Sequence, residues 1–255
     1  MIAQVNTPRQ RQRFLNACRG KLCCGATLPL ALQLLGKAQP GRFFAGPTLA
    51  LDIGGRTAWA AGHANPEELA SFLNFCGCRA VILDEAECPP PVGWQKTCDH
   101  TIFGLAAGEQ LPLPAQTEAQ KALWDSLTFV EDPASGPVAE NLFPDRPARR
   151  DDFYSELCTK RSRGKALVWT LEQGGNIVCT VGAYALCNGQ AYMACGQTAE
   201  ALRGQRVGGR LIVAMGHAPS PPGGQPAFLS SPPRGAFFTQ IGLHPPGAPS
   251  RFRKP

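Results

Sequence analysis

Two stretches of this 255-residue chain show the same order of predicted elements, a β-hairpin followed by a helix and then a strand. Apolar and polar residues alternate around glycine-rich turns in the hairpins, and proline or glycine opens each helix. A repeated order of this kind predicts an α/β protein built as two tandem halves. In sequence order the predicted elements are a helix opened by Thr7-Pro8, a short helix opened by Pro29, a hairpin over 48–60 that turns at 52–55, a helix from Asn65-Pro66, a strand over 79–83, a hairpin turning at Asn188-Gly189, a helix from Val207 and a strand over 226–230.

The segment between the halves is broken up by proline. Six prolines fall between residues 111 and 150, around one predicted helix near 118–127. Because proline removes a backbone donor and fixes φ, such a segment is typical of a junction. We therefore predict a first domain over 1–110 and a second over 111–255, with 111–150 as the junction segment.

The loop before the second predicted helix has the chemistry of an anion site. It follows a strand ending near Thr198, contains glycines at 204, 208 and 209, and carries Arg203, Arg206 and Arg210 within eight residues. The first N–H groups of a helix have no partner within it, and the helix dipole is positive at this end. Glycine lets backbone amides approach a ligand closely, so the loop suits a pyrophosphate. Neither common nucleotide-binding fingerprint fits it.

The loop resembles the acyl-coenzyme A loop of the GNAT superfamily of N-acetyltransferases, whose pattern is Q/R-x-x-G-x-G/A. Residues 203–208 read Arg-Gly-Gln-Arg-Val-Gly, with Arg206 at the first patterned glycine, where we expect a negative φ. The aromatic pair Phe237-Phe238, a few residues before Gly242, is similar to a late signature of the family. Phe238 stands where the family often has a tyrosine that protonates the leaving thiolate. The first half has no such loop over 61–66, and we interpret it as a degenerate GNAT-like domain.

The resemblance implies a mixed, mostly antiparallel twisted sheet with flanking helices. It also implies an enzyme, an acyltransferase that moves an acetyl group from acetyl-CoA, its co-substrate, to an amine of a small molecule or peptide. The residues expected to bind the cofactor are Thr198, Arg203, Gly204, Gln205, Arg206, Val207, Gly208 and Gly209.

The expected catalytic residues are Gln197, Thr198 and Glu200. A backbone N–H near the end of the Thr198 strand would stabilise the oxyanion. Gln197 could orient a water, and Glu200 is either a general base or a solvated loop residue. The identity of the amine and the oligomeric state do not follow from the sequence.

Charge and composition leave other readings open. Residues 1–145 hold 11 basic and 14 acidic side chains, a net −3, whereas residues 146–255 hold 14 and 5, a net +9. The basic half and the tail over 251–254 could bind nucleic acid, but few aromatics are interleaved with the basic residues, so we expect no nucleic-acid partner. Phe238 favours a non-catalytic acyl-CoA-binding or scaffold protein, and the loop could also be a plain glycine-rich turn.

The 11 cysteines and the basic N-terminal region need separate readings. Cys76-Gly77-Cys78, Cys88 and Cys98 lack the paired spacing of zinc ligands, so no metal site is expected.

A basic stretch before the apolar residues 22–36 faintly resembles a signal peptide, but Pro29 interrupts it. It is also too short to span a bilayer. We therefore expect a cytoplasmic protein with reduced thiols and no membrane partner.

Overall fold

The structure is a computed structural model that describes residues 1–105, 109–217, 225–230, 235–247 and 249–255. The Cα packing divides the chain into two compact units. The first unit contains 1–104, 229–236 and 244–255, and the second contains 105–228 and 237–243. The predicted division into 1–110 and 111–255 stays a prediction. In the part of the chain that the structure describes, no helix has the length and apolar character needed to cross a membrane.

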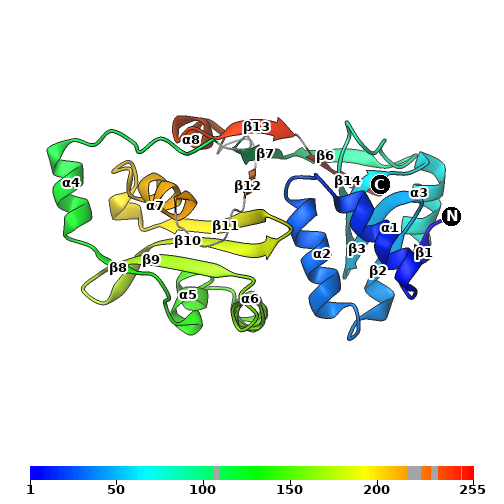
Figure 1. Ribbon diagram of the computed structural model, residues 1–255, viewed down its shortest axis with the longest axis horizontal. Coiled ribbons are helices and arrows are strands. Elements are labelled where there is room, and N and C mark those ends of the chain that lie inside the picture. The colour runs from blue at the N-terminus through cyan, green and yellow to red at the C-terminus, as the bar shows by residue number, and fades with distance from the viewer. Residues whose placement is uncertain (106–108, 218–224, 231–234, 248) are drawn as a thin grey trace. The chain divides into compact units, whose positions relative to one another are not determined.

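The first unit is built on a seven-stranded sheet of order β1-β2-β3-β4-β5-β14-β6 (Figure 1). Neighbouring strands run antiparallel except β4 and β5, which are parallel. Strands β7 and β13 form a further antiparallel pair in this unit. The strands are β1 (Ala3–Gln4), β2 (Phe43–Ala45), β3 (Thr48–Gly54), β4 (Thr57–His63), β5 (Ala80–Asp84), β6 (Gln95–Asp99), β7 (Thr101–Gly104), β13 (His244–Gly247) and β14 (Pro249–Arg253).

Helices pack on both faces of this sheet. The helices are α1 (Pro8–Cys18), α2 (Cys24–Leu35), the short 3₁₀ helix η1 (Pro40–Arg42) and α3 (Pro66–Phe75). Side chains of α1 and α2, such as Phe14 and Leu28, form one buried cluster with Ala50 and Ala61. Side chains of α3 form a second cluster with Leu51 and its neighbours. Alternate residues of a strand point to opposite faces, so the apolar runs of β3 and β4 supply both clusters.

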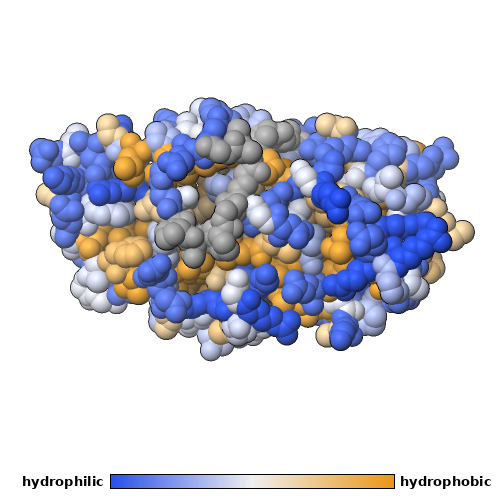
Figure 2. All heavy atoms as spheres, in the orientation of Figure 1, coloured by the Kyte–Doolittle hydropathy of each residue, from blue (hydrophilic) through white to orange (hydrophobic). Residues whose placement is uncertain are grey.

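Two of the predicted helix starts are confirmed by their caps. The Thr7 hydroxyl accepts from the Gln10 backbone N–H at 3.2 Å, which opens α1 as a capping box. The exposed side of α1 is hydrophilic (Figure 2), in keeping with its run of arginine and glutamine residues. The Asn65 side chain accepts from the Glu67 and Glu68 backbone N–H groups at 2.9 and 3.0 Å, which opens α3.

The second unit contains adjacent strands in the order β12-β11-β10-β9-β8, and β12 belongs to it up to Phe228. All of these pairs are antiparallel except β11 with β12, which is parallel. The strands are β8 (Thr128–Val130), β9 (Leu167–Gln173), β10 (Asn176–Cys187), β11 (Gln190–Thr198) and β12 (Gln225–Ser230). Asn188 and Gly189, at φ 53° and 69°, form the predicted turn between β10 and β11.

Helices again lie on both faces of the strands, with α5 and α6 on one side and α7 on the other (Figure 1). Leu157 of α6 and Val138 of α5 pack on Val168 and Tyr184 of the sheet. The helices are α4 (Glu118–Asp125), α5 (Ser135–Leu142), α6 (Pro147–Arg161), the 3₁₀ helix η2 (Glu200–Leu202), α7 (Val207–Gly216) and α8 (Gly235–Gln240), which belongs to this unit from Phe237 on.

The two-half α/β prediction is confirmed by the topology. Strands β3 and β4, helix α3 and strand β5 correspond to β10 and β11, α7 and β12. In both sets the hairpin is antiparallel, and its second strand pairs in parallel with the strand after the helix. The fold class is therefore the mixed, mostly antiparallel sheet with flanking helices that was expected.

Two local expectations were wrong. Pro29 was expected to open its helix, but α2 begins at Cys24 and Pro29 lies inside it. Burial of Leu28, Leu30 and other side chains outweighs the loss of one helical donor. Asp52 was expected in a turn, but it lies in β3, buried, with both carboxylate oxygens bonded to the Arg42 guanidinium.

The basic C-terminal residues were also read wrongly as a tail. They form β14, between β5 and β6 of the first sheet. Phe252 alternates with arginines along the strand, and its ring is buried in the cluster with Leu51 and Val81. A strand inserted between two others has both rows of backbone groups paired, so this end of the chain completes the first unit.

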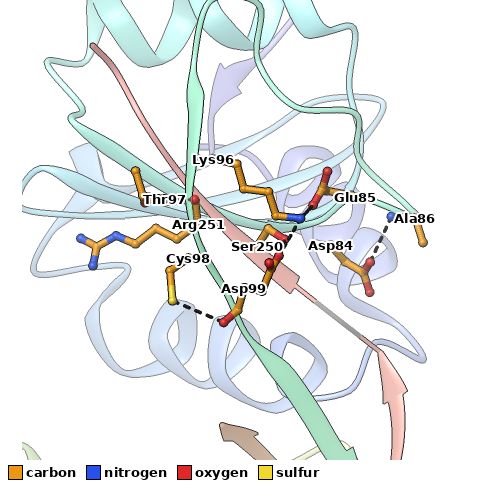
Figure 3. Close-up of polar contacts among 9 residues, drawn as sticks. All are labelled: Asp84, Glu85, Ala86, Lys96, Thr97, Cys98, Asp99, Ser250 and Arg251. Atoms are coloured by element: carbon orange, nitrogen blue, oxygen red, sulfur yellow. Dashed lines mark hydrogen bonds and ion pairs between the residues drawn. The ribbon is translucent and has the colours of Figure 1, made fainter. Parts of the chain in front are cut away.

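A polar network stabilises β14 beside β6 (Figure 3). The Lys96 ammonium lies 2.7 Å from a Glu85 carboxylate oxygen and 2.6 Å from one of Asp99. The Ser250 hydroxyl donates to Asp99 at 2.9 Å. Hydrogen bonds from Lys96 and then Ser250 lower the pKa of both Glu85 and Asp99 below their ordinary values of 4.5 and 3.8.

We expect Phe252→Ala to lower the free energy of unfolding of the first unit by about 3–5 kcal/mol, because it leaves a cavity in a packed core. Urea unfolding, monitored through hydrogen exchange at the backbone amides of β5 and β14, measures the effect. Arg253→Ala, on the exposed side of the same strand, is the matched control and should change stability by less than about 0.5 kcal/mol. Equal effects of the two substitutions would mean that β14 does not complete this core.

The ion pairs of Lys96 with Glu85 and Asp99 predict how the stability of the first unit depends on pH. A carboxylate whose folded pKa is lowered stabilises the fold above its ordinary pKa and loses that effect as the pH falls through the folded value. The first unit should therefore lose stability as the pH falls below about 4.5. Lys96→Met should flatten this dependence in urea unfolding at several pH values, whereas Lys37→Met, at an exposed site, should not. Identical profiles for both variants would contradict the network.

Candidate functional site

The N-terminus of α7 is open for a ligand. Arg206 precedes its first residue, and no side chain caps the helix. The first N–H groups of a helix have no carbonyl partner within it, and here neither a serine, a threonine nor an acid takes their place. The combined dipole of the peptide units also makes this end of the helix positive. The arrangement favours an anion.

A pocket of about 690 Å³ opens at this helix end. Residues of the predicted loop form one side of it, and residues of α8 and of the segment before α4 form the rest. The lining residues are Pro114, Ala115, Thr198, Leu202, Arg203, Gly204, Arg206, Val207, Gly208, Gly209, Phe237, Gln240 and Ile241. All but one of the predicted cofactor residues line it, and the exception is Gln205.

The loop enters the helix through left-handed backbone. Gly204 has φ 76°, and Arg206 has φ 62°, so the expected negative φ at Arg206 was wrong. The glycine of the family pattern would adopt this conformation without strain, whereas an arginine there costs roughly 1–2 kcal/mol. The strained residue lines the pocket, as is common for strain at binding sites.

The three loop arginines have different surroundings. The Arg203 Nε donates to the Thr198 carbonyl oxygen at 3.3 Å, and the Arg206 Nη1 donates to the Ala115 carbonyl at 2.7 Å. Both line the pocket. The Arg210 guanidinium instead lies 4.3 Å from the centre of the Trp124 ring and bonds to the Gln116 side chain. Arg203 and Arg206 therefore supply the positive charge at the pocket, and Arg210 joins α7 to α4.

Two glycines bring α7 close to its neighbours. A Cβ at Gly208 would lie 2.7 Å from the Thr198 hydroxyl oxygen, and a Cβ at Gly209 would lie 3.0 Å from Ile241. The Thr198 hydroxyl also lies 3.4 Å from the Cys179 sulfur, and burial raises the pKa of that thiol, so it stays neutral. Packing alone therefore disfavours a side chain at either position.

Strand β11 is irregular just before the loop. Thr180 pairs with Gln197 and Gly182 with Ala194, so Cys195 and Gly196 together oppose Val181. This is a β-bulge, in which a backbone group is left out of the ladder. Among the described residues, parallel pairing with β12 runs only from Gln190 to Met193, and β11 continues beyond it. The end of β11, whose Thr198 lines the pocket, therefore extends beyond the described pairing with β12.

The predicted catalytic residues are not all together. Thr198 lines the pocket. Gln197 is exposed, and its Nε2 donates to the Asn141 carbonyl oxygen at 3.2 Å, while Glu200 is exposed in η2. Neither of these two side chains lines the pocket. Across the described residues no group of three or more His, Cys, Asp or Glu could hold a metal ion.

The aromatic pair of α8 is divided between core and pocket. Phe238 is buried, with its ring 5.0 Å from Phe228, whereas Phe237 is 40% exposed and lines the pocket. Phe237, Gln240 and Ile241 were missed as pocket residues, although their spacing along one helical face is a signal in the sequence. Pro114 and Ala115 carried no signal, because they reach the pocket from an irregular segment.

The corresponding helix of the first half is closed to anions. Asn65 occupies the backbone N–H groups of Glu67 and Glu68 at the start of α3. Two carboxylates stand in that first turn, and Glu68 also pairs with the Met1 ammonium at 3.2 Å. Acidic side chains at the positive end repel an anionic ligand. Of these two corresponding helix starts, that of α7 is therefore the open one, and it carries arginines.

No family model and no curated protein matches this sequence. Solved structures of other proteins do match the fold of this chain. A GCN5-related N-acetyltransferase from Sphaerobacter thermophilus is similar with a TM-score of 0.65 and 13% identity, over 100% of this chain and 95% of that one. A tandem GNAT protein from the clavulanic acid biosynthesis pathway gives 0.63 and 13%, over 99% and 97%.

A third structure, a GCN5-related N-acetyltransferase from Kribbella flavida, gives a TM-score of 0.60 and 16% identity over 90% of this chain and 95% of that one. The chain has the GNAT fold. The resemblance read from residues 203–208 is confirmed at the level of the fold, and the tandem protein supports two GNAT halves. At identities this low the likeness shows the GNAT architecture and leaves substrate and activity to the site itself.

Because Arg206 is strained, we expect Arg206→Gly to be at least as stable as the wild type, whereas Arg206→Ala should be less stable than both. Glycine relieves the left-handed strain, while alanine keeps the strain and loses the bond to Ala115. Thermal unfolding measures this, with a difference of about 2–4 °C for each kcal/mol. Alanine matching glycine in melting temperature would mean that the loop is not left-handed at this position.

Proposed function

We propose that this protein is an N-acetyltransferase that transfers an acetyl group from acetyl-CoA to a primary amine of a small molecule or peptide in the cytoplasm. The observation that carries the proposal is the uncapped N-terminus of α7, which faces a 690 Å³ pocket between Arg203 and Arg206. The GNAT fold supports the same reaction class.

The residues of the loop fit a pyrophosphate. The backbone N–H groups of Val207, Gly208 and Gly209 are the free donors of the helix start, and Gly204 leaves room beside them. Arg203 and Arg206 add two positive charges, each already oriented by a carbonyl acceptor. Donors oriented in this way lose little conformational freedom on binding, which favours affinity. Gln205 and Thr198 complete the predicted cofactor set.

Acetyl-CoA supplies a thioester whose carbonyl carbon the neutral amine attacks. A C–N bond forms, the C–S bond breaks, and the amine proton passes to a base or water. Negative charge develops on the thioester oxygen, and in this proposal a backbone N–H at the bulge of Cys195–Gly196 donates to it. The thioester would therefore lie along the end of β11, and the pyrophosphate at α7.

Proton transfer falls to groups other than Phe238, whose ring carries no hydroxyl. Glu200 and Gln197 lie on either side of Thr198 in sequence, and both are exposed. In these positions they can act through water rather than by direct contact, which suits a relay that carries the amine proton to solvent. The thiolate then leaves without a tyrosine donor.

A second candidate is an acyl-CoA-binding protein without catalysis. Phe238 in place of a proton donor favours it, as does the absence of a carboxylate among the described residues that line the pocket. The two candidates share the cofactor site and differ only in turnover, so binding and catalysis must be measured separately.

Arg203→Met should weaken acetyl-CoA binding at least tenfold in isothermal titration calorimetry, because one charge at the pyrophosphate is lost. Arg163→Met, an exposed basic residue of the same unit, is the matched control and should bind as the wild type does. Gly208 is unsuitable as a first test because any side chain there meets Thr198. No binding of acetyl-CoA or CoA to the wild type would overturn the proposal.

Turnover is tested by release of free CoA thiol with a panel of primary amines and amino-terminal peptides. The proposal predicts thiol release that depends on the amine and is lost in Arg203→Met at low acetyl-CoA. Acetyl-CoA binding without release for every amine would favour the non-catalytic candidate. The parallel addition of an oligonucleotide should leave both binding and turnover unchanged.

A further inference from the structure

The first unit has a pocket of its own, of about 270 Å³, where the segment between α1 and α2 lies against β4 and β5. Strands β4 and β5 pair only from Thr57 to Trp59 among the described residues, and the pocket lies next to this point. The lining residues are Gly20, Lys21, Leu22, Cys23, Cys24, Trp59, Ala60, Ala61, Ile82, Leu83, Asp84, Glu87, Ile102 and Pro249.

The wall formed by Leu22–Cys24 is strained. Cys23 has φ 62° and ψ −61°, and the Cys24 backbone N–H donates to the Leu22 carbonyl oxygen at 2.7 Å. This is the classic γ-turn, a rare conformation for a residue with a side chain. Strain of this kind persists only where the surroundings impose it, and it gathers at binding sites.

The charges on the pocket are predominantly negative. Lys21 is paired with Glu87 at 2.5 Å. Asp84 accepts the Ala86 backbone N–H at 3.1 Å, as Figure 3 shows, and among the described residues no cation lies within 4.0 Å of it. One ammonium and two carboxylates leave a net charge of −1 on an otherwise apolar pocket.

The start of α2, on the pocket wall, is not open to an anion. The first N–H groups of α2 already donate to carbonyl oxygens of the γ-turn segment, since Gly25 bonds to Lys21 at 2.7 Å and Thr27 to Cys23 at 2.9 Å. Burial, and then the negative charges of Glu87 and Asp84, raise the pKa of Cys24 to about 12. The thiol is therefore neutral at pH 7, and both carboxylates act on the space beside it.

We propose that this pocket is a second ligand site, specific for a compact organic ammonium ion with an apolar body. The ammonium would pair with Asp84 and share Glu87 with Lys21, and the apolar body would lie against Trp59, whose ring also favours a cation. The pocket holds no more than a small molecule, so the ligand is a free amine rather than a protein chain. This site is independent of acetyl transfer.

Calorimetry with benzylammonium as the probe tests the site, with benzyl alcohol and benzoate as neutral and anionic probes of similar shape. We expect benzylammonium to bind and the other two to bind at least tenfold more weakly. Asp84→Asn should weaken benzylammonium at least tenfold while leaving the fold intact, because the asparagine oxygen can still accept the Ala86 N–H. Asp125→Asn, an exposed acid of the second unit, is the control.

Lys21→Met gives a test of opposite sign. It frees Glu87 from its ion pair, so benzylammonium should bind more tightly. Benzoate binding that is lost in Lys21→Met, or benzylammonium binding unaffected by Asp84→Asn, would overturn the proposal, as would no binding of any probe. Arg203 lines the other pocket and not this one, so Arg203→Met should leave the affinities of these probes unchanged. That result separates this site from the proposed acetyl transfer.

Discussion

The arrangement of the second half depends on how closely α7 approaches β11. Gly208 has no side chain, and the Thr198 hydroxyl takes the place where a Cβ would lie. This contact sets the uncapped helix N-terminus at the end of a bulged strand, with the Arg203 side chain bonded to the Thr198 carbonyl. Helix donors and arginines thus meet at one pocket beside the end of β11, and a larger residue at 208 would separate them from the strand.

The two halves show how one topology can keep or lose an anion site. At the start of α3, Asn65 caps the helix and two glutamates fill its first turn. At the start of α7, there is no cap and the charges are positive. The fold positions a helix N-terminus in both halves, but the local residues decide whether it is free. The charge difference between the parts of the chain follows partly from this: Arg203 and Arg206 face the pocket, whereas Arg210 is used in packing on Trp124.

Much of this could be read from the sequence because it rests on local rules. Thr7 and Asn65 are caps, Asn188-Gly189 is a turn, and the loop before Val207 has the residues of an anion site. The features that could not be read from the sequence depend on tertiary contacts. Burial keeps Pro29 within a helix, and β14 is held by partners more than 150 residues away in sequence, such as Asp99 with Ser250. The φ of Arg206 depends on the whole loop, and Pro114 and Ala115 reach the pocket through a segment without a pattern.

The central claim is that the free N–H groups of α7 bind the phosphates of coenzyme A. Amide ¹H–¹⁵N chemical shifts recorded while coenzyme A is added test it most directly. The account predicts that the largest changes fall on the amides of Val207, Gly208 and Gly209, with those of Glu67 and Glu68 at α3 unchanged. Changes centred on α3, or none at α7 when coenzyme A is bound, would contradict it.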